Sequence, residues 1–152
     1  MKLPDASYLL PASRAEEIGF SAAHEAFQGH RDMGITSLKD LEVWKVAHQA
    51  VLKTYRMTSG FPSDERFCLV QQMRKCAVSI PANIAEGFGR RRPKEKIRFY
   101  NISQGSVEEL RYYFILACDL GYASEASGAS DLLDSVARML NRLIASISAS
   151  LP

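Results

Sequence analysis

The sequence predicts an all-α protein, an antiparallel up-down four-helix bundle with a proline-kinked second helix. Four segments between residues 39 and 149 space their apolar residues three and four positions apart, which is the period of one helix face. The loops between these segments are short and contain glycine, proline or serine. No segment alternates apolar and polar residues as a half-buried strand does. Four helices of similar length joined by short loops favour the up-down arrangement.

Composition predicts one domain preceded by an extension. The chain has 152 residues, of which 47% are hydrophobic, and this suffices for one domain with its own core. Residues 37–150 are predicted to form the bundle domain. Residues 1–36 are predicted to be a weakly structured N-terminal extension that the fold does not need, because prolines and glycines interrupt each candidate helix there.

The cysteines and the hydropathy pattern bear on location. The three cysteines, Cys68, Cys76 and Cys118, form no CxxC pair or Cys/His cluster, so we expect free buried thiols and no zinc site. No apolar run approaches the ~20 residues that a membrane-spanning helix needs, and no secretory signal pattern is present. We therefore expect a cytoplasmic protein with no membrane partner.

The first two helices are predicted on either side of Gly60 and Pro62. The first covers residues 39–58, and the predicted core face consists of Leu41, Trp44, His48, Val51 and Tyr55. The second follows Ser63 as its N-cap and ends at Gly87–Gly89. Its predicted core face consists of Leu69, Met73, Cys76, Ile80 and Ile84.

Pro81 lies inside the second series. It removes the backbone donor to the Ala77 carbonyl and costs about 3 kcal/mol in a helix interior. The alternatives are a kinked continuous helix and two shorter helices. Because the apolar series stays on one face across the proline, the sequence favours the kink. Ser79 and Asn83 are predicted to hydrogen-bond to the carbonyls left free.

The third helix is predicted from Pro93 in its first turn to Leu120, with Gly121 as its C-cap. Gly105 lies in mid-helix, and we expect another helix to approach closely there, since glycine otherwise weakens a helix. The predicted core face consists of Phe99, Ile102, Ser106, Leu110, Tyr113 and Ala117. The fourth helix is predicted over residues 131–149, with the core face Leu133, Val136, Leu140, Leu143 and Ile147.

Several apolar residues lie off these faces and predict a homo-oligomer, because surplus apolar surface usually becomes an interface. They are Leu52, Tyr112, Ile115, Leu132, Met139 and Ile144.

The most basic run follows the second helix and predicts contact with a nucleic-acid backbone. Its cations are Arg90, Arg91, Arg92, Lys94, Lys96 and Arg98, against the single acid Glu95. The neighbouring rings of Phe88, Phe99 and Tyr100 are candidates for stacking on bases. The alternative is a solvated loop with Phe88 and Phe99 packed in the core.

The acidic residues are predicted to form structural ion pairs and not a catalytic or metal site. Glu86, Glu108 and Glu109 have no Glu-x-x-His pattern beside them, so a di-iron or other metal site is not expected. We expect these glutamates to pair with Arg74, Arg90 or Arg111. Trp44 and His48, one turn apart, are expected to pack in the core. No catalytic residue and no cofactor are predicted.

Three motifs resemble one family, the bacterial 23S rRNA intervening-sequence proteins, which are four-helix bundles. The motifs are LEVW at 41–44, QQMRKCAVSIPANIAEGFGR at 71–90 and GSVEEL at 105–110. The resemblance covers about residues 37–149. It marks Pro81, Asn83, Glu86, Gly87 and Gly105 as structural positions.

The resemblance implies a ring of five bundles and a setting in large-subunit rRNA genes. A more distant similarity is to the accessory variability protein of diversity-generating retroelements, which binds nucleic acid and a reverse transcriptase. The expected function is a non-enzymatic oligomer that binds RNA or DNA through the basic run. The alternative is an interaction scaffold that docks a protein partner, such as a nucleic-acid enzyme, without touching nucleic acid.

Overall fold

The computed structural model describes residues 35–151, which form four long helices. Their bounds are Glu42–Thr58 (α2), Leu69–Gly89 (α3), Pro93–Asp119 (α4) and Ala129–Ala149 (α5). Three single turns of 3-10 helix, at Leu38–Asp40 (η2), Ser63–Glu65 (η3) and Glu125–Ser127 (η4), lie in the connections. The extension predicted over residues 1–36 lies almost wholly outside the described residues, so that prediction stays open.

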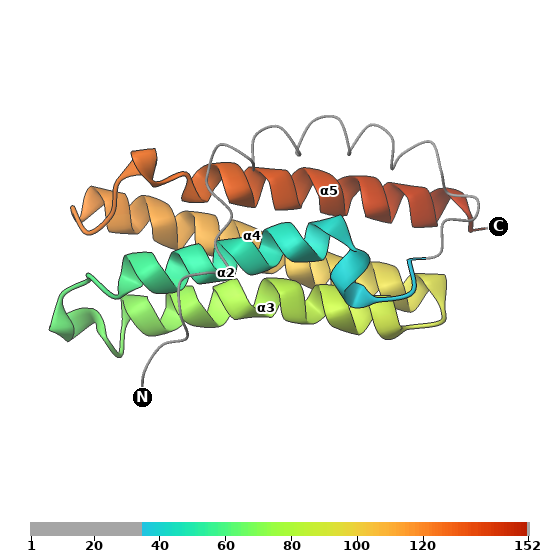
Figure 1. Ribbon diagram of the computed structural model, residues 1–152, viewed down its shortest axis with the longest axis horizontal. Helices are drawn as coiled ribbons and strands as arrows, with labels where there is room; N and C mark the ends of the chain where they lie inside the picture. The colour runs from blue at the N-terminus through green and yellow to red at the C-terminus, as the bar shows by residue number, and fades with distance from the viewer. Residues whose placement is uncertain (1–34, 152) are drawn as a thin grey trace. The chain divides into compact units, whose positions relative to one another are not determined.

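The four helices form the predicted up-down bundle. Figure 1 shows each helix running antiparallel to the one before it. Helix α3 packs on α2 and α4, and helix α5 packs on α4 and α2, which closes the bundle. Within residues 35–151, no helix is long and apolar enough to cross a membrane.

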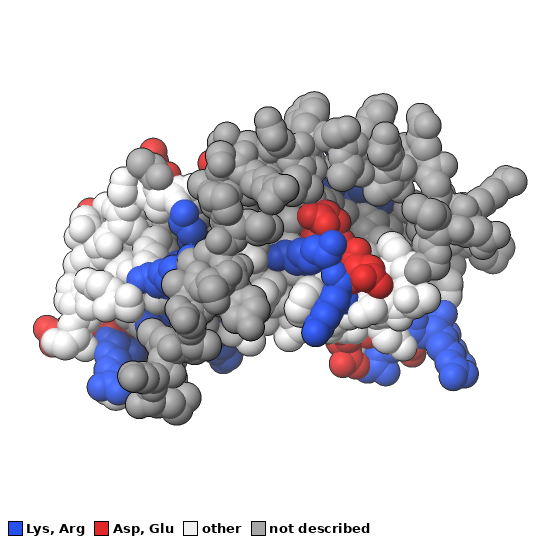
Figure 2. All heavy atoms as spheres, viewed as in Figure 1, with Lys and Arg blue, Asp and Glu red and all other residues white. Residues whose placement is uncertain are grey.

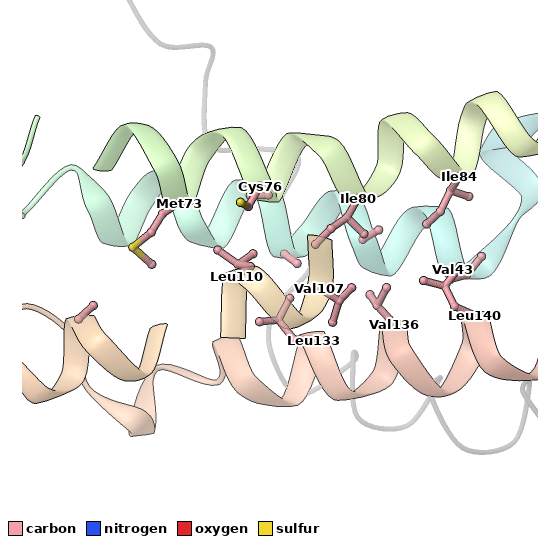
Figure 3. Packing of buried hydrophobic residues seen from close by; sticks show 14 of the residues in the cluster. Val43, Met73, Cys76, Ile80, Ile84, Val107, Leu110, Leu133, Val136 and Leu140 are labelled. Carbon is pink, nitrogen blue, oxygen red and sulfur yellow. The ribbon is translucent and has the colours of Figure 1, made fainter. Parts of the chain in front are cut away.

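The core face predicted for α3 is confirmed. All five of its residues are buried. Figure 3 shows four of them, Met73, Cys76, Ile80 and Ile84, on the side of α3 that faces α4 and α5. The predicted face of α5 is buried at Leu133, Val136 and Leu140 and partly buried in its last turns. Both helices carry bulky apolar residues at the positions that face inward, so the spacing of these residues predicted the buried face correctly.

The face predicted for α2 is only partly correct. Leu41, Trp44 and Val51 are partly buried against the core, whereas His48 and Tyr55 lie at the surface. The fully buried residues of the helix are Val43, Ala47, Ala50, Thr54 and Thr58. Small side chains let α2 approach its neighbours, and each threonine hydroxyl donates to the carbonyl four residues back, at 2.8 Å.

Trp44 and His48 also differ from the prediction of core packing. Trp44 is partly buried against the core and His48 is exposed, and their rings stack on each other with centroids 5.4 Å apart.

The face predicted for α4 is rotated by about one residue along its first half. Tyr100, Ser103, Val107 and Phe114 are buried, whereas Ile102 is 42% exposed. Aromatic and aliphatic residues occupy both faces of this helix, so a search for apolar spacing finds two candidate faces. The predicted Ser106, Leu110 and Ala117 are buried as expected.

Helix α3 continues through Pro81, so one helix and not two is confirmed. Asn83 Nδ2 donates to the Ser79 carbonyl at 2.8 Å, which is not the Ala77 carbonyl that the proline leaves free. From α4, Ser103 Oγ donates to the Ile80 carbonyl at 3.0 Å. The Ser79 hydroxyl bonds the Ser106 hydroxyl at 2.9 Å, so two polar contacts just before Pro81 tie α3 to α4.

The close helix approach expected at Gly105 occurs at Gly87 instead. A Cβ atom at Gly87 would lie 2.6 Å from Cε1 of Tyr100, which is 2% exposed. A Cβ atom at Gly105 would meet nothing within 4 Å, and Gly105 is exposed. The rotated face of α4 explains the error, because Gly105 points away from α3 and its neighbour Ser106 packs inward.

The ends of the helices differ slightly from prediction. Ser63 opens η3, and α3 begins six residues later at Leu69, whose amide donates to Glu65 Oε2 at 3.2 Å. Gly121 does terminate α4, with a φ of 74° that favours glycine.

Candidate nucleic-acid interface

The basic run forms the turn between α3 and α4 and the first turns of α4, and we call residues 90–98 the α3–α4 turn. Arg90 leaves α3 in an extended conformation (φ −76°, ψ 142°), and Pro93 opens α4 with Arg92 as N-cap. Figure 1 shows this turn at one end of the bundle, and Figure 2 shows Lys and Arg side chains projecting there.

Two of the six cations serve the fold. Arg90 forms an ion pair with Glu86 one turn back, and its guanidinium lies 4.9 Å from the centre of the Phe99 ring. Lys96 Nζ donates to the Phe88 carbonyl at 3.0 Å, among the last carbonyls of α3. A cation at a helix C-terminus stabilises the exposed carbonyls. Burial lowers the pKa of the Lys96 ammonium.

The other four cations, Arg91, Arg92, Lys94 and Arg98, are exposed. Within residues 35–151, none of their side chains has a hydrogen bond, an ion pair or a ring contact to the protein. Arg92 and Lys94 also sit at the N-terminus of α4, where the helix dipole disfavours positive charge. We call these four residues the unpaired cations.

The three aromatic side chains near the turn differ in exposure. Tyr100 is buried against Gly87, so its assignment as a base-stacking residue is wrong. Phe88 and Phe99 are half-buried outside the core cluster, so the alternative that packs them in the core is also wrong. Lys96 lies 5.8 Å from the centre of the Phe88 ring and Arg90 lies 4.9 Å from the centre of the Phe99 ring. Stacking of bases on these two rings stays a prediction.

The glutamates are occupied by structural contacts. Glu86 pairs with Arg90 as predicted, and Glu108 pairs with Arg111 at 2.6 Å. Arg111 also reaches Asp134 at 2.5 Å, which joins α4 to α5. These pairs are largely exposed, so each contributes less than about 1 kcal/mol.

Glu109 and Arg74 do not form the predicted ion pairs. Glu109 accepts a hydrogen bond from the Tyr113 hydroxyl at 3.1 Å, and Arg74 Nε donates to Thr58 Oγ1 at 2.9 Å. Burial, with help from a hydrogen bond to Glu109, raises the pKa of the Cys76 thiol to about 12. The part of the chain that the structure describes contains no group of three His, Cys, Asp or Glu that would hold a metal ion.

A second cationic surface was missed by the sequence analysis. We call it the α2–α3 groove, a hollow of about 500 Å³ lined by Tyr55, Arg66, Phe67, Val70, Gln71, Arg74, Lys75 and Val78. Its residues are scattered over two helices and a loop, so no single run of charge marks it. The signal in the sequence was Phe67, an aromatic residue between Arg66 and the start of α3.

A comparison with protein-family models agrees with the resemblance that the sequence motifs indicate. The model of the family described as "23S rRNA-intervening sequence protein" matches residues 39–142, which run from η2 into α5. The chain belongs to this family. The match includes Pro81, Gly87 and the whole α3–α4 turn. No curated protein matches the chain.

Proposed function

We propose that this member of the 23S rRNA-intervening sequence protein family is a non-enzymatic, cytoplasmic oligomer that binds RNA or DNA backbones through the four unpaired cations. The family's name refers to 23S rRNA, which supports a link to nucleic acid, and a cationic surface at the end of a bundle suits a polyanion. The single observation that carries the proposal is the position of Arg92 and Lys94 at the N-terminus of α4.

Cations at this position destabilise the helix, so the stability of the fold does not explain why they are there. Each cation near a helix N-terminus destabilises the helix by about 0.3–1 kcal/mol at low ionic strength. Arg91, Arg92 and Lys94 also repel one another without a described carboxylate partner. A bound anion removes both penalties, because phosphate oxygens suit the free amides at a helix N-terminus.

Oligomerisation would strengthen a weak site. Tyr112 and Ile115 on α4 are 60% and 58% exposed, which supports an interface on that helix. Their off-core companions Leu132, Met139 and Ile144 on α5 are partly buried against the core instead, so the predicted surplus is exposed on α4 and not on α5. A ring, which the family resemblance suggests has five subunits, would repeat the turn around its axis and add avidity.

A variant that removes only the unpaired cations tests the proposal. Gln replaces Arg91, Arg92, Lys94 and Arg98, while Arg90 and Lys96 stay because they hold the fold. The matched control replaces four cations on other elements by Gln, namely Lys39, Arg56, Arg138 and Arg142. Gel-shift titrations at low salt should show binding by the wild type and the control and little binding by the turn variant. Equal binding by all three proteins would show that the α3–α4 turn does not bind nucleic acid.

The exposed surface of α4 also favours a second candidate, a scaffold that docks a protein partner without touching nucleic acid. A wild-type protein that binds neither RNA nor DNA at low salt would support this candidate. Tyr112 and Ile115 would then be the first residues to replace in a pull-down of partners.

A further inference from the structure

The α2–α3 groove has an unusual combination of charge and aromatic surface. Three of its lining residues are cations, Arg66, Arg74 and Lys75, and none is an acid. It is a hollow of about 500 Å³ that lies largely open to solvent. It shares no residue with the α3–α4 turn.

Arg74 is fixed in place at the groove. Its Nε donates to Thr58 Oγ1 at 2.9 Å, and its guanidinium lies 4.7 Å from the centre of the Tyr55 ring. Within the described residues, no carboxylate lies within ion-pair distance of it. An arginine that is held by neutral contacts keeps its full charge for an external anion.

The rings of the groove lie open to solvent. Phe67 is 76% exposed and Tyr55 is 43% exposed, beside Val78 at 44%. The Arg66 guanidinium lies 5.4 Å from the centre of the Phe67 ring. Phe67 contributes little to the core at this exposure, so packing does not explain an aromatic residue here.

We infer that the α2–α3 groove binds single-stranded nucleic acid, with a base stacked on Phe67 or Tyr55 and the adjoining phosphates against Arg66, Arg74 and Lys75. Open cationic grooves with aromatic rings bind single strands in this way, because every base offers a face to stack on. A duplex keeps its bases stacked on one another and offers the groove only phosphates. The inference goes beyond the proposed function, in which the turn attracts any backbone, and it does not depend on the turn.

The test separates base stacking from charge. The ligands are an oligothymidylate strand, a strand of equal length without bases, and a duplex of equal length. The protein variants are Phe67→Ala, the turn variant described above, and Leu120→Ala as a control that removes exposed apolar surface elsewhere. Fluorescence anisotropy gives the affinities, and a thermal melt shows that each variant folds.

Phe67→Ala should weaken binding of oligothymidylate about fivefold to a hundredfold, which corresponds to the loss of one stacked base. Its affinity for the strand without bases and for the duplex should stay within about twofold of wild type. Leu120→Ala should change none of the three affinities.

Three results would overturn the inference. One is a Phe67→Ala variant that binds oligothymidylate as tightly as wild type. Another is an equal loss on the strand without bases. A third concerns polyglutamate with the same charge as the oligothymidylate strand. If the wild type binds it and Phe67→Ala weakens that binding, the groove would be a site for an acidic protein. Failure of the proposed function looks different, because there the turn variant keeps its affinity for all three nucleic acids.

Discussion

Helices α3 and α4 meet in two ways, along a packed seam and at a charged turn. We call the seam the residues by which the two helices contact each other: Cys76, Ser79, Ile80 and Gly87 against Tyr100, Ser103, Ser106 and Glu109. In the seam, buried hydroxyls and carbonyls have partners. In the turn, four cations have none among the described residues. The same pair of helices therefore contains side chains that stabilise the fold, in the seam, and side chains that make no contact with it, in the turn.

The largest effect is expected at the Cys76 thiol in the seam. Its pKa is raised to about 12 from 9.0, so at pH 8 its thiolate fraction is about a thousandfold lower than that of an unperturbed thiol. In the native protein the exposed Cys68 should react with a disulfide reagent long before Cys76. Peptide mapping after a short reaction measures the order. Equal labelling of both would show that the seam opens readily.

The same shift makes stability depend on pH. The folded pKa lies above the unfolded value, so the thiol contributes its full stabilisation below about pH 9. That contribution is lost as the pH rises through the folded pKa. Cys76→Ala should flatten the alkaline decline of the free energy of unfolding, which urea titrations at several pH values record.

The two glycines should respond in opposite ways to alanine. Gly87→Ala places a methyl group against the buried Tyr100 ring and should destabilise the protein by about 2 kcal/mol. Gly105→Ala meets open space and should stabilise the protein by up to about 1 kcal/mol. Chemical denaturation measures both. A stabilising Gly87→Ala would place the close approach elsewhere.

Ser103 tests the polar part of the seam. Ser103→Ala removes the bond that the Ile80 carbonyl accepts from α4 but leaves its bond within α3, and the loss of one such hydrogen bond costs about 0.5–1.5 kcal/mol. Ser135→Ala is the matched control, because the Ser135 hydroxyl bonds the Asp131 carbonyl at an exposed site. Denaturation midpoints that fall equally in both variants would contradict a special role for Ser103.

Lys96 and Lys94 compare a structural cation with an unpaired one. Lys96→Gln loses an ammonium at the C-terminal carbonyls of α3 and should destabilise the protein by less than about 1 kcal/mol. Lys94→Gln removes a cation from the N-terminus of α4 and should stabilise the protein by about 0.3–1 kcal/mol at low salt. Thermal melts at low and high salt check the signs and their decay with screening.

The seam and the turn also differ in what the sequence could reveal. The α3 side of the seam was predicted because its bulky aliphatic residues lie on one face only. The fully buried residues of α2 were missed because Ala47, Ala50 and Thr54 are small and carry little periodic signal. The place of Gly87 against Tyr100 depends on how α4 is rotated, which apolar spacing alone does not fix.

For the candidate interface, the sequence predicted the cluster of positive charge but not which of its residues are free to bind a ligand. The run of six cations is plain in the sequence. Which two are tied down depends on distances to Glu86, to the Phe99 ring and to the Phe88 carbonyl, and these exist only in the fold. The α2–α3 groove was hidden for the same reason, since its cations and rings come from separate segments.

The salt dependence of binding tests the central claim, that the unpaired cations bind a nucleic-acid backbone. Four neutralised phosphates on a single strand give a slope of about −3 in log K against log salt, and each cation lost reduces the slope by about 0.7. The account predicts about −3 or steeper for the wild type and a slope shallower by about 3 for the turn variant. A turn variant with the slope and affinity of the wild type would contradict it.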